Sequence, residues 1–173
     1  MRKRILGMAV SAGVLVAAFP AAASASAPAD STGGWTPVTY QSTDAAAGTV
    51  CPFELRTDFP TQAVEERIAS TYPDGSPLET DFRGPLIAHY TNEATGKTVD
   101  EDLSGAGTLY SLPDKSSLWV VPDNFGVTIR AGDPYHAQGE YVLAGPSVVS
   151  VSPTHQIAVL YQTKTIDVCA VLS

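Results

Sequence analysis

The sequence contains few of the residues on which catalysis and metal binding most often depend. Only two cysteines and three histidines occur in 173 residues. His89, His136 and His155 do not follow the His-x-His or His-x-x-x-His spacing that places two ligands on one metal ion. Neither a Gly-x-Ser-x-Gly segment nor an Asp-x-Asp-x-Asp-Gly loop is present, so no nucleophile elbow and no calcium loop is predicted. We therefore expect no cofactor, no metal and no catalytic motif.

Basic residues are also scarce. The chain has 10 lysines and arginines against 18 aspartates and glutamates, which gives a formal net charge of −8 at pH 7. Nucleic acids and anionic membranes repel a protein with this balance of charge. Neither is expected as a partner, and a small molecule or an extracellular protein remains.

Long hydrophobic runs are absent except at the N-terminus. Arg2, Lys3 and Arg4 precede an apolar run over residues 5–19, and Ala23-Ser24-Ala25 follows it. The run has about 15 residues, fewer than the ~20 that a membrane-spanning helix needs. A cationic start, a short apolar run and small residues are typical of a secretory signal peptide. We expect residues 1–25 to be removed, and the mature protein to begin at Ser26 and to be secreted into the extracellular medium.

The two cysteines, Cys51 and Cys169, lie near the two ends of the expected folded region. Outside the cell the surroundings are oxidising, and two cysteines without a metal-binding pattern are expected to form a disulfide there. This bond would join the first structured segment to the last, across 118 residues of sequence.

Residues 26–48 are rich in Ala, Ser, Thr, Gly and Pro and are expected to form a flexible leader. Trp35, Val38 and Tyr40 leave open a short strand or a lid within it. Residues 49–173 are expected to form one all-β domain, because apolar and polar residues alternate as in half-buried strands. Strands are predicted at residues 53–58, 86–91, 97–103, 108–112, 118–121, 127–130, 141–144, 148–151, 156–161 and 165–172. The one plausible helix is at residues 64–70, although its apolar residues could equally face a sheet.

Turn signals separate these strands. Tyr72-Pro73-Asp74-Gly75, Leu112-Pro113-Asp114-Lys115 and Val121-Pro122-Asp123-Asn124 share a Pro-Asp pair that favours tight turns. The links are too short for crossover helices, so neighbouring strands are expected to be antiparallel. A bond between the first and last strands favours a closed antiparallel β-barrel, and a two-layer β-sandwich is the alternative.

Several side chains are candidates for chemistry or binding. Asp100 with Asp102, and Glu79 with Asp81, could supply carboxylates beside His89 or His136, but solvated strand faces are the favoured explanation of these residues. Thr95-Gly96-Lys97-Thr98 lacks the upstream glycine of a phosphate-binding loop. The weak candidates for lining a ligand site are four aromatic residues: Tyr110, Trp119, Tyr141 and Tyr161.

The order of these signals resembles that in a group of small, secreted, β-rich proteins from actinobacteria, which have one disulfide and mostly no assigned function. The segments that carry the likeness are Cys51-Pro52-Phe53-Glu54-Leu55, Tyr72-Pro73-Asp74-Gly75, Tyr90-Thr91-Asn92, Thr95-Gly96-Lys97-Thr98, Leu103-Ser104-Gly105 and Asp167-Val168-Cys169-Ala170. These motifs are turns and a disulfide, and the resemblance implies no catalytic residue. Lys115 stands where such proteins often have glycine.

Three functions remain open. The first hypothesis is a secreted accessory or ligand-binding β-barrel that takes up a small apolar ligand in its interior. The second is an extracellular hydrolase or cyclase that uses dispersed carboxylates and a histidine. The third is a secreted protease inhibitor that presents an exposed loop such as residues 122–126.

Overall fold

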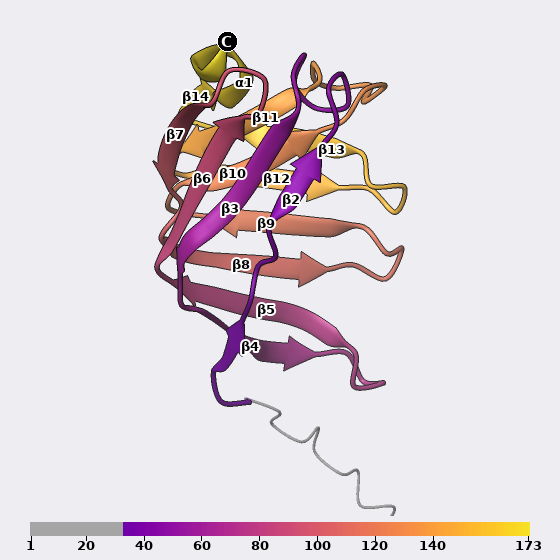
Figure 1. The fold of residues 1–173 in the computed structure, drawn as a ribbon. Helices are drawn as coiled ribbons and strands as arrows, with labels where there is room; N and C mark the ends of the chain where they lie inside the picture. The colour runs from indigo at the N-terminus through magenta and orange to yellow at the C-terminus, as the bar shows by residue number, and fades with distance from the viewer. Residues whose placement is uncertain (1–32) are drawn as a thin grey trace, which may run out of the picture.

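A computed structural model describes residues 33–173, which form an all-β domain with one short helix (Figure 1). The expected signal peptide and the start of the mature chain at Ser26 lie outside the described residues. No helix within residues 33–173 is long and apolar enough to cross a membrane.

Most of the domain consists of six long strands that each bend once, so that each contributes to two sheets. One to three residues separate the two parts of each long strand. The parts are β3 (Leu55–Gln62) and β4 (Val64–Thr71), β5 (Pro77–Gly84) and β6 (Leu86–Asn92), β7 (Lys97–Asp102) and β8 (Gly105–Ser111), β9 (Ser117–Val121) and β10 (Phe125–Ile129), β11 (Gly139–Ala144) and β12 (Ser147–Val151), and β13 (Ile157–Tyr161) and β14 (Lys164–Asp167).

Glycine and proline mark several of these bends. Gly84 has a φ of +132°, and a side chain there would collide with the carbonyl oxygen of Ala63 at the neighbouring bend. Pro85 follows it and cannot donate a hydrogen bond to a neighbouring strand. The two adjacent strands can therefore bend side by side, because one supplies a residue without Cβ at the point of closest approach.

The strands form three sheets in which every pair is antiparallel. The seven-stranded sheet has the order β1-β4-β5-β8-β9-β12-β13, with β1 at Thr36–Val38. The four-stranded sheet has the order β2-β3-β6-β7, with β2 at Thr43–Ala45, and the three-stranded sheet has the order β10-β11-β14. In Figure 1, β3 and β6 cross in front of the seven-stranded sheet.

The three-stranded sheet lies between the other two. Val142 of β11 is fully buried in a core cluster with Leu55, Ala88 and Tyr90 of the four-stranded sheet. The next residue, Leu143, points to the opposite face, where the second core cluster includes Val149, Trp119 and other residues of the seven-stranded sheet. Each face of β11 therefore contributes to a separate core.

Cys51 and Cys169 form the expected disulfide, with their Cα atoms 5.4 Å apart. Cys169 belongs to the helix α1 (Val168–Leu172). Asp167 caps the start of this helix, because its side chain accepts a hydrogen bond from the backbone of Ala170. The helix is held at its other end by Asn92, whose side-chain amide donates to the carbonyl oxygen of Leu172 at 3.1 Å. Residues 165–172 are therefore not one strand as predicted, since the chain turns into a helix so that Cys169 can reach Cys51.

Other predictions need correction. Residues 64–70 form the strand β4 and not a helix, since they pair with β1 and β5. The leader segment, where the sequence leaves a short strand open, contains the two short strands β1 and β2. The three sheets do not join into a closed barrel, so the barrel prediction is not confirmed, whereas the all-β class and the disulfide are confirmed.

Candidate functional site

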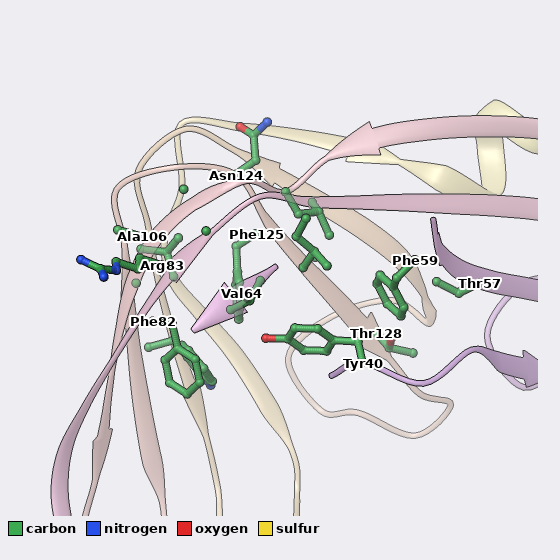
Figure 2. A pocket seen from close by; sticks show the side chains of 18 of the residues that line it. Tyr40, Thr57, Phe59, Val64, Phe82, Arg83, Ala106, Asn124, Phe125 and Thr128 are labelled. Carbon is green, nitrogen blue, oxygen red and sulfur yellow. The ribbon is translucent and has the colours of Figure 1, made fainter. Parts of the chain in front are cut away.

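A pocket of about 360 Å³ lies beside β10, one of the two edge strands of the three-stranded sheet (Figure 2). All three sheets contribute to its lining. The seven-stranded sheet supplies Phe82, Trp119 and Val121, the four-stranded sheet supplies Thr57, Phe59 and Tyr90, and the three-stranded sheet supplies Phe125, Gly126, Thr128 and Glu140.

The pocket lies where the long strands stop pairing with one another. On one side of the bends, β8 and β9 pair from Thr108↔Val120 to Ser111↔Ser117. On the other side of the bends, β7 pairs with β6 and β10 pairs with β11, but β7 and β10 do not pair with each other. The sheet therefore splits between β7 and β10, and the pocket occupies part of the space between the separated parts.

Aromatic rings form much of the pocket wall. The ring of Trp119 lies 5.1 Å from that of Phe82 and 5.3 Å from that of Phe125, measured between centroids. The rings of Tyr40 and Phe59 form a second group, 5.5 Å apart, and Figure 2 shows these two side by side. Tilted rings at these separations are the arrangement that aromatic pairs prefer.

Gly126 keeps part of this space open. A Cβ atom at this position would lie 3.1 Å from Cδ1 of Leu103 and 3.5 Å from the hydroxyl oxygen of Tyr90. The absence of a side chain at this position of β10 therefore leaves room between β10 and the four-stranded sheet.

The pocket has one buried carboxyl group, that of Glu140, which is 6% exposed. The hydroxyl of Thr128 donates to its Oε2 at 2.6 Å, and the hydroxyl of Tyr90 donates to its Oε1 at 3.2 Å. Burial raises the pKa of Glu140, and the two hydrogen bonds oppose part of this shift. Burial and the neighbouring Glu140 together raise the pKa of Tyr90, so its hydroxyl keeps its proton.

Residues 36–45 form a strap along one side of the pocket. β1 pairs with β4 of the seven-stranded sheet and β2 with β3 of the four-stranded sheet, so the strap connects both sheets. Tyr40 and Gln41 lie between these two strands and line the pocket. The side chain of Gln62 fixes the strap, since its Oε1 accepts from the backbone of Tyr40 at 2.7 Å and its Nε2 donates back to the carbonyl of Tyr40 at 3.1 Å.

The four aromatic candidates from the sequence lie in different places. Trp119 lines the pocket described above. Tyr141 lines a second pocket of about 170 Å³ on the opposite face of the three-stranded sheet. Tyr110 donates to Glu79 at 3.4 Å on the outer face of the seven-stranded sheet, and Tyr161 is 54% exposed. One of the four therefore belongs to the larger pocket.

The histidines and their candidate carboxylates do not line the larger pocket. His89 pairs with Asp100 at 2.5 Å on the outer face of the four-stranded sheet, since its neighbours Ala88 and Tyr90 point into the core. His136 lines the second pocket, with its Nδ1 4.0 Å from Asp133. Asp133 is already occupied as an acceptor for three backbone N–H groups.

The acidic pair Glu79 and Asp81 also faces away from the pocket. Asp81 accepts from Arg67 at 2.9 Å and from the hydroxyl of Thr108 at 3.0 Å. In the part of the chain that the structure describes, no group of three or more His, Cys, Asp or Glu side chains could hold a metal ion.

Glu140, Tyr90 and Thr128 are site residues that the sequence pattern did not predict. The predicted strand at 141–144 begins two residues later than β11 and leaves Glu140 outside it. Glu140 lies two positions before Val142 and therefore shares its strand face. An acidic residue on a strand face that is otherwise apolar is unusual, and this was the signal in the sequence that could have indicated a site.

Comparisons with protein-family models, with curated proteins and with solved structures each find no match to the chain. The geometry of the pocket therefore carries the functional inference.

Proposed function

We propose that this protein is a secreted binding protein that holds a small, largely apolar molecule in the pocket between its three sheets. The observation that carries the proposal is a pocket of about 360 Å³ with aromatic walls from several strands and one buried carboxyl group. Most small-molecule sites have this character, since apolar walls supply affinity and a few polar groups fix the orientation of the ligand. The N-terminal signal pattern and the disulfide agree with a role outside the cell.

The alternative functions have less support. A hydrolase or cyclase of the kind expected from the sequence needs a histidine beside a carboxylate in a pocket. The close His89–Asp100 pair lies on an outer face, and His136 lies in the smaller pocket 4.0 Å from a carboxylate that already accepts three backbone hydrogen bonds.

A protease inhibitor needs a loop that stands free of the body of the protein. Residues 122–126 include the bend between β9 and β10, which is tied down at both of its polar side chains. Asp123 accepts from the backbone of Ala106 at 2.9 Å, while Asn124 donates to the carbonyl of Asp102 at 2.8 Å. This bend therefore offers little free loop to a protease.

The proposal can be tested with N-phenyl-1-naphthylamine, an uncharged apolar dye that fluoresces strongly only when it is shielded from water. The dye is titrated into the oxidised protein and into the variants Val121→Phe and Val120→Phe. Val121 is buried and lines the pocket, whereas Val120, next to it on β9, faces outward and is 39% exposed. The two variants therefore add the same side chain on opposite faces of one strand.

We expect saturable fluorescence for the wild type and for Val120→Phe, and binding weakened by about tenfold or more for Val121→Phe, because the new ring occupies the pocket. Circular dichroism and thermal unfolding verify that each variant is folded. A Trp35→Phe background leaves Trp119 as the sole tryptophan of the two in the chain, so quenching of its emission reports binding at the pocket even if Val121→Phe does not fold. Absence of saturable binding, or equal binding by both phenylalanine variants, would overturn the proposal.

A further inference from the structure

The carboxyl group of Glu140 has no cationic partner within the pocket. Its two oxygens receive hydrogen bonds from neutral hydroxyls, those of Thr128 on β10 and Tyr90 on β6. Buried carboxylates in proteins are usually paired with a positive charge, because transfer of an unpaired charge from water into an apolar site is costly. Glu140 is therefore an incomplete ion pair, or a carboxyl group that keeps its proton while the pocket is empty.

Arg83 is the one cationic residue among those that line the pocket, and its charge is used elsewhere. Its guanidinium lies 3.9 Å above the ring of Trp35, and its Nη2 donates to Glu65 at 3.1 Å. Figure 2 shows this side chain extending away from the aromatic side chains of the pocket. The protein itself therefore supplies no positive charge to Glu140.

The surroundings of Glu140 suit an organic cation. Six aromatic residues line the pocket: Tyr40, Phe59, Phe82, Tyr90, Trp119 and Phe125. The faces of aromatic rings attract cations, and the attraction is greatest where water is excluded. The chain as a whole has a net charge of −8, which attracts cations and repels anions at longer range.

The polar end of the pocket is also accessible to a ligand. Thr128 is exposed, although its hydroxyl donates to the buried Glu140, so solvent reaches the pocket wall beside the carboxyl group. Two hydrogen bonds leave lone pairs of the carboxylate free to accept donors from a ligand, since a carboxylate offers about four such positions.

We propose that the ligand of this pocket is a hydrophobic amine, whose ammonium group pairs with Glu140 while its apolar body lies against Trp119 and Phe125. This inference rests on the proposed binding function and narrows it to one class of ligand. The volume of about 360 Å³ lies near the lower end of the ~300–1,000 Å³ that is usual for ligand pockets. A body of one or two fused rings with a short aminoalkyl group matches this size.

The test compares three probes with the same aromatic body and different charge: 2-naphthylmethylamine, 2-naphthylmethanol and 2-naphthoic acid. Their affinities for the oxidised protein are measured by calorimetry at pH 7. We expect the amine to bind about tenfold or more tightly than the alcohol, since a charge-assisted hydrogen bond replaces a neutral one, and the acid to bind most weakly.

The variant Glu140→Gln keeps the shape of the side chain and removes its charge. It should reduce the affinity of the amine to that of the alcohol, and should change the affinity of the alcohol by less than about twofold. Glu101→Gln is the matched control, because Glu101 is a partly buried carboxylate on β7 that does not line the pocket. This variant should keep the preference for the amine.

The outcomes separate this inference from the proposed function. If the alcohol binds as tightly as the amine, or the acid binds most tightly, or Glu140→Gln keeps the preference, the amine proposal is wrong while the binding function stands. If none of the three probes binds and the uncharged dye does not bind either, the binding function itself is wrong. The ratio of amine to alcohol affinity in the wild type decides the first question even if Glu140→Gln does not fold.

Discussion

Removal of the disulfide tests how the two ends of the domain are held together. The Cys51–Cys169 bond closes a loop that spans 118 residues, and both cysteines belong to the core between the four-stranded and three-stranded sheets. In the chain-entropy account, a crosslink stabilises a protein by restricting its unfolded state, and the effect grows with the length of the loop. For a loop of this length the relation gives about 5 kcal/mol at 25 °C.

The structure shows which contacts hold the C-terminal helix when the bond is absent. Without it, α1 stays attached through the packing of Val168 and Leu172 and through the hydrogen bonds from Asn92 and Lys97 to the last two residues. These noncovalent contacts exist only in the folded state, so they do not restrict the unfolded chain. We therefore expect the loss of most of the crosslink's contribution, although the folded state keeps nearly all of its contacts.

The measurement is urea unfolding and thermal unfolding of the Cys51→Ala/Cys169→Ala variant and of the reduced wild type. We expect the free energy of unfolding to fall by about 3–5 kcal/mol and the melting temperature to fall by roughly 10–20 °C. The reduced wild type serves as the control for packing, since it keeps both sulfur atoms in the core. A decrease below about 1 kcal/mol in both proteins would refute the reasoning, because the chain ends would then be held by noncovalent contacts alone.

Three further changes have defined expectations. Lys115 has a φ of +69°, and the first Pro-Asp turn has a glycine, Gly75, at the corresponding position. Because a glycine adopts this conformation without strain, Lys115→Gly should raise the free energy of unfolding in urea by about 1 kcal/mol, and an unchanged value would contradict this. Gly84→Ala should lower the free energy of unfolding by about 2 kcal/mol or more, because the new Cβ atom collides with the carbonyl oxygen of Ala63. In the control Gly75→Ala the new Cβ atom has no other atom within 4 Å, and the free energy of unfolding should fall by about 1 kcal/mol. Burial raises the pKa of folded Glu140 above its unfolded value of about 4.3, so ionisation of this group should reduce stability as pH rises from that value through the folded pKa. Urea unfolding across a pH series should then show Glu140→Gln gaining stability relative to the wild type as pH rises, and a constant difference would be the contrary result.

Most of the strands, although not β5, and two of the three Pro-Asp turns were predictable because their signals are local. In the first turn the backbone of Gly75 donates to the carbonyl of Tyr72 at 2.9 Å, and in the second Lys115 donates to Leu112 at the same distance. Proline and aspartate favour this conformation in nearly any surroundings. Antiparallel pairing followed from the shortness of the links between strands.

The third Pro-Asp segment shows where local signals fail. Residues 121–124 do not reverse the chain, and instead bend one long strand between β9 and β10. Asp123 and Asn124 bind the backbones of Ala106, Asp102 and Gly145, which belong to other bends. These partners are distant in sequence, so the choice between a turn and a bend depended on tertiary contacts that no local pattern contains.

The choice between a helix and a strand at residues 64–70 also depended on tertiary contacts. Glutamate, arginine and alanine are good helix formers, but two of the three charged residues of β4 stand opposite charges of the other sign on β5. Glu65 lies opposite Arg83, and Arg67 opposite Asp81. Cross-strand pairs of this kind stabilise a sheet, and they become visible only when the register of both strands is known.

The pocket gathers features that each lower the stability of the fold at one place. β7 and β10 do not pair with each other, and Gly126 leaves space where a side chain would contact Leu103. The carboxyl group of Glu140 is buried on the same strand face as the fully buried Val142. An apolar residue at position 140 and a side chain at position 126 would fill the space and remove the cost of burying an ionisable group. Features that cost stability are expected where function requires them, and random packing faults would not cluster around one carboxyl group with two hydroxyl donors. Their coincidence favours a site that binding has shaped over a cavity left by imperfect packing.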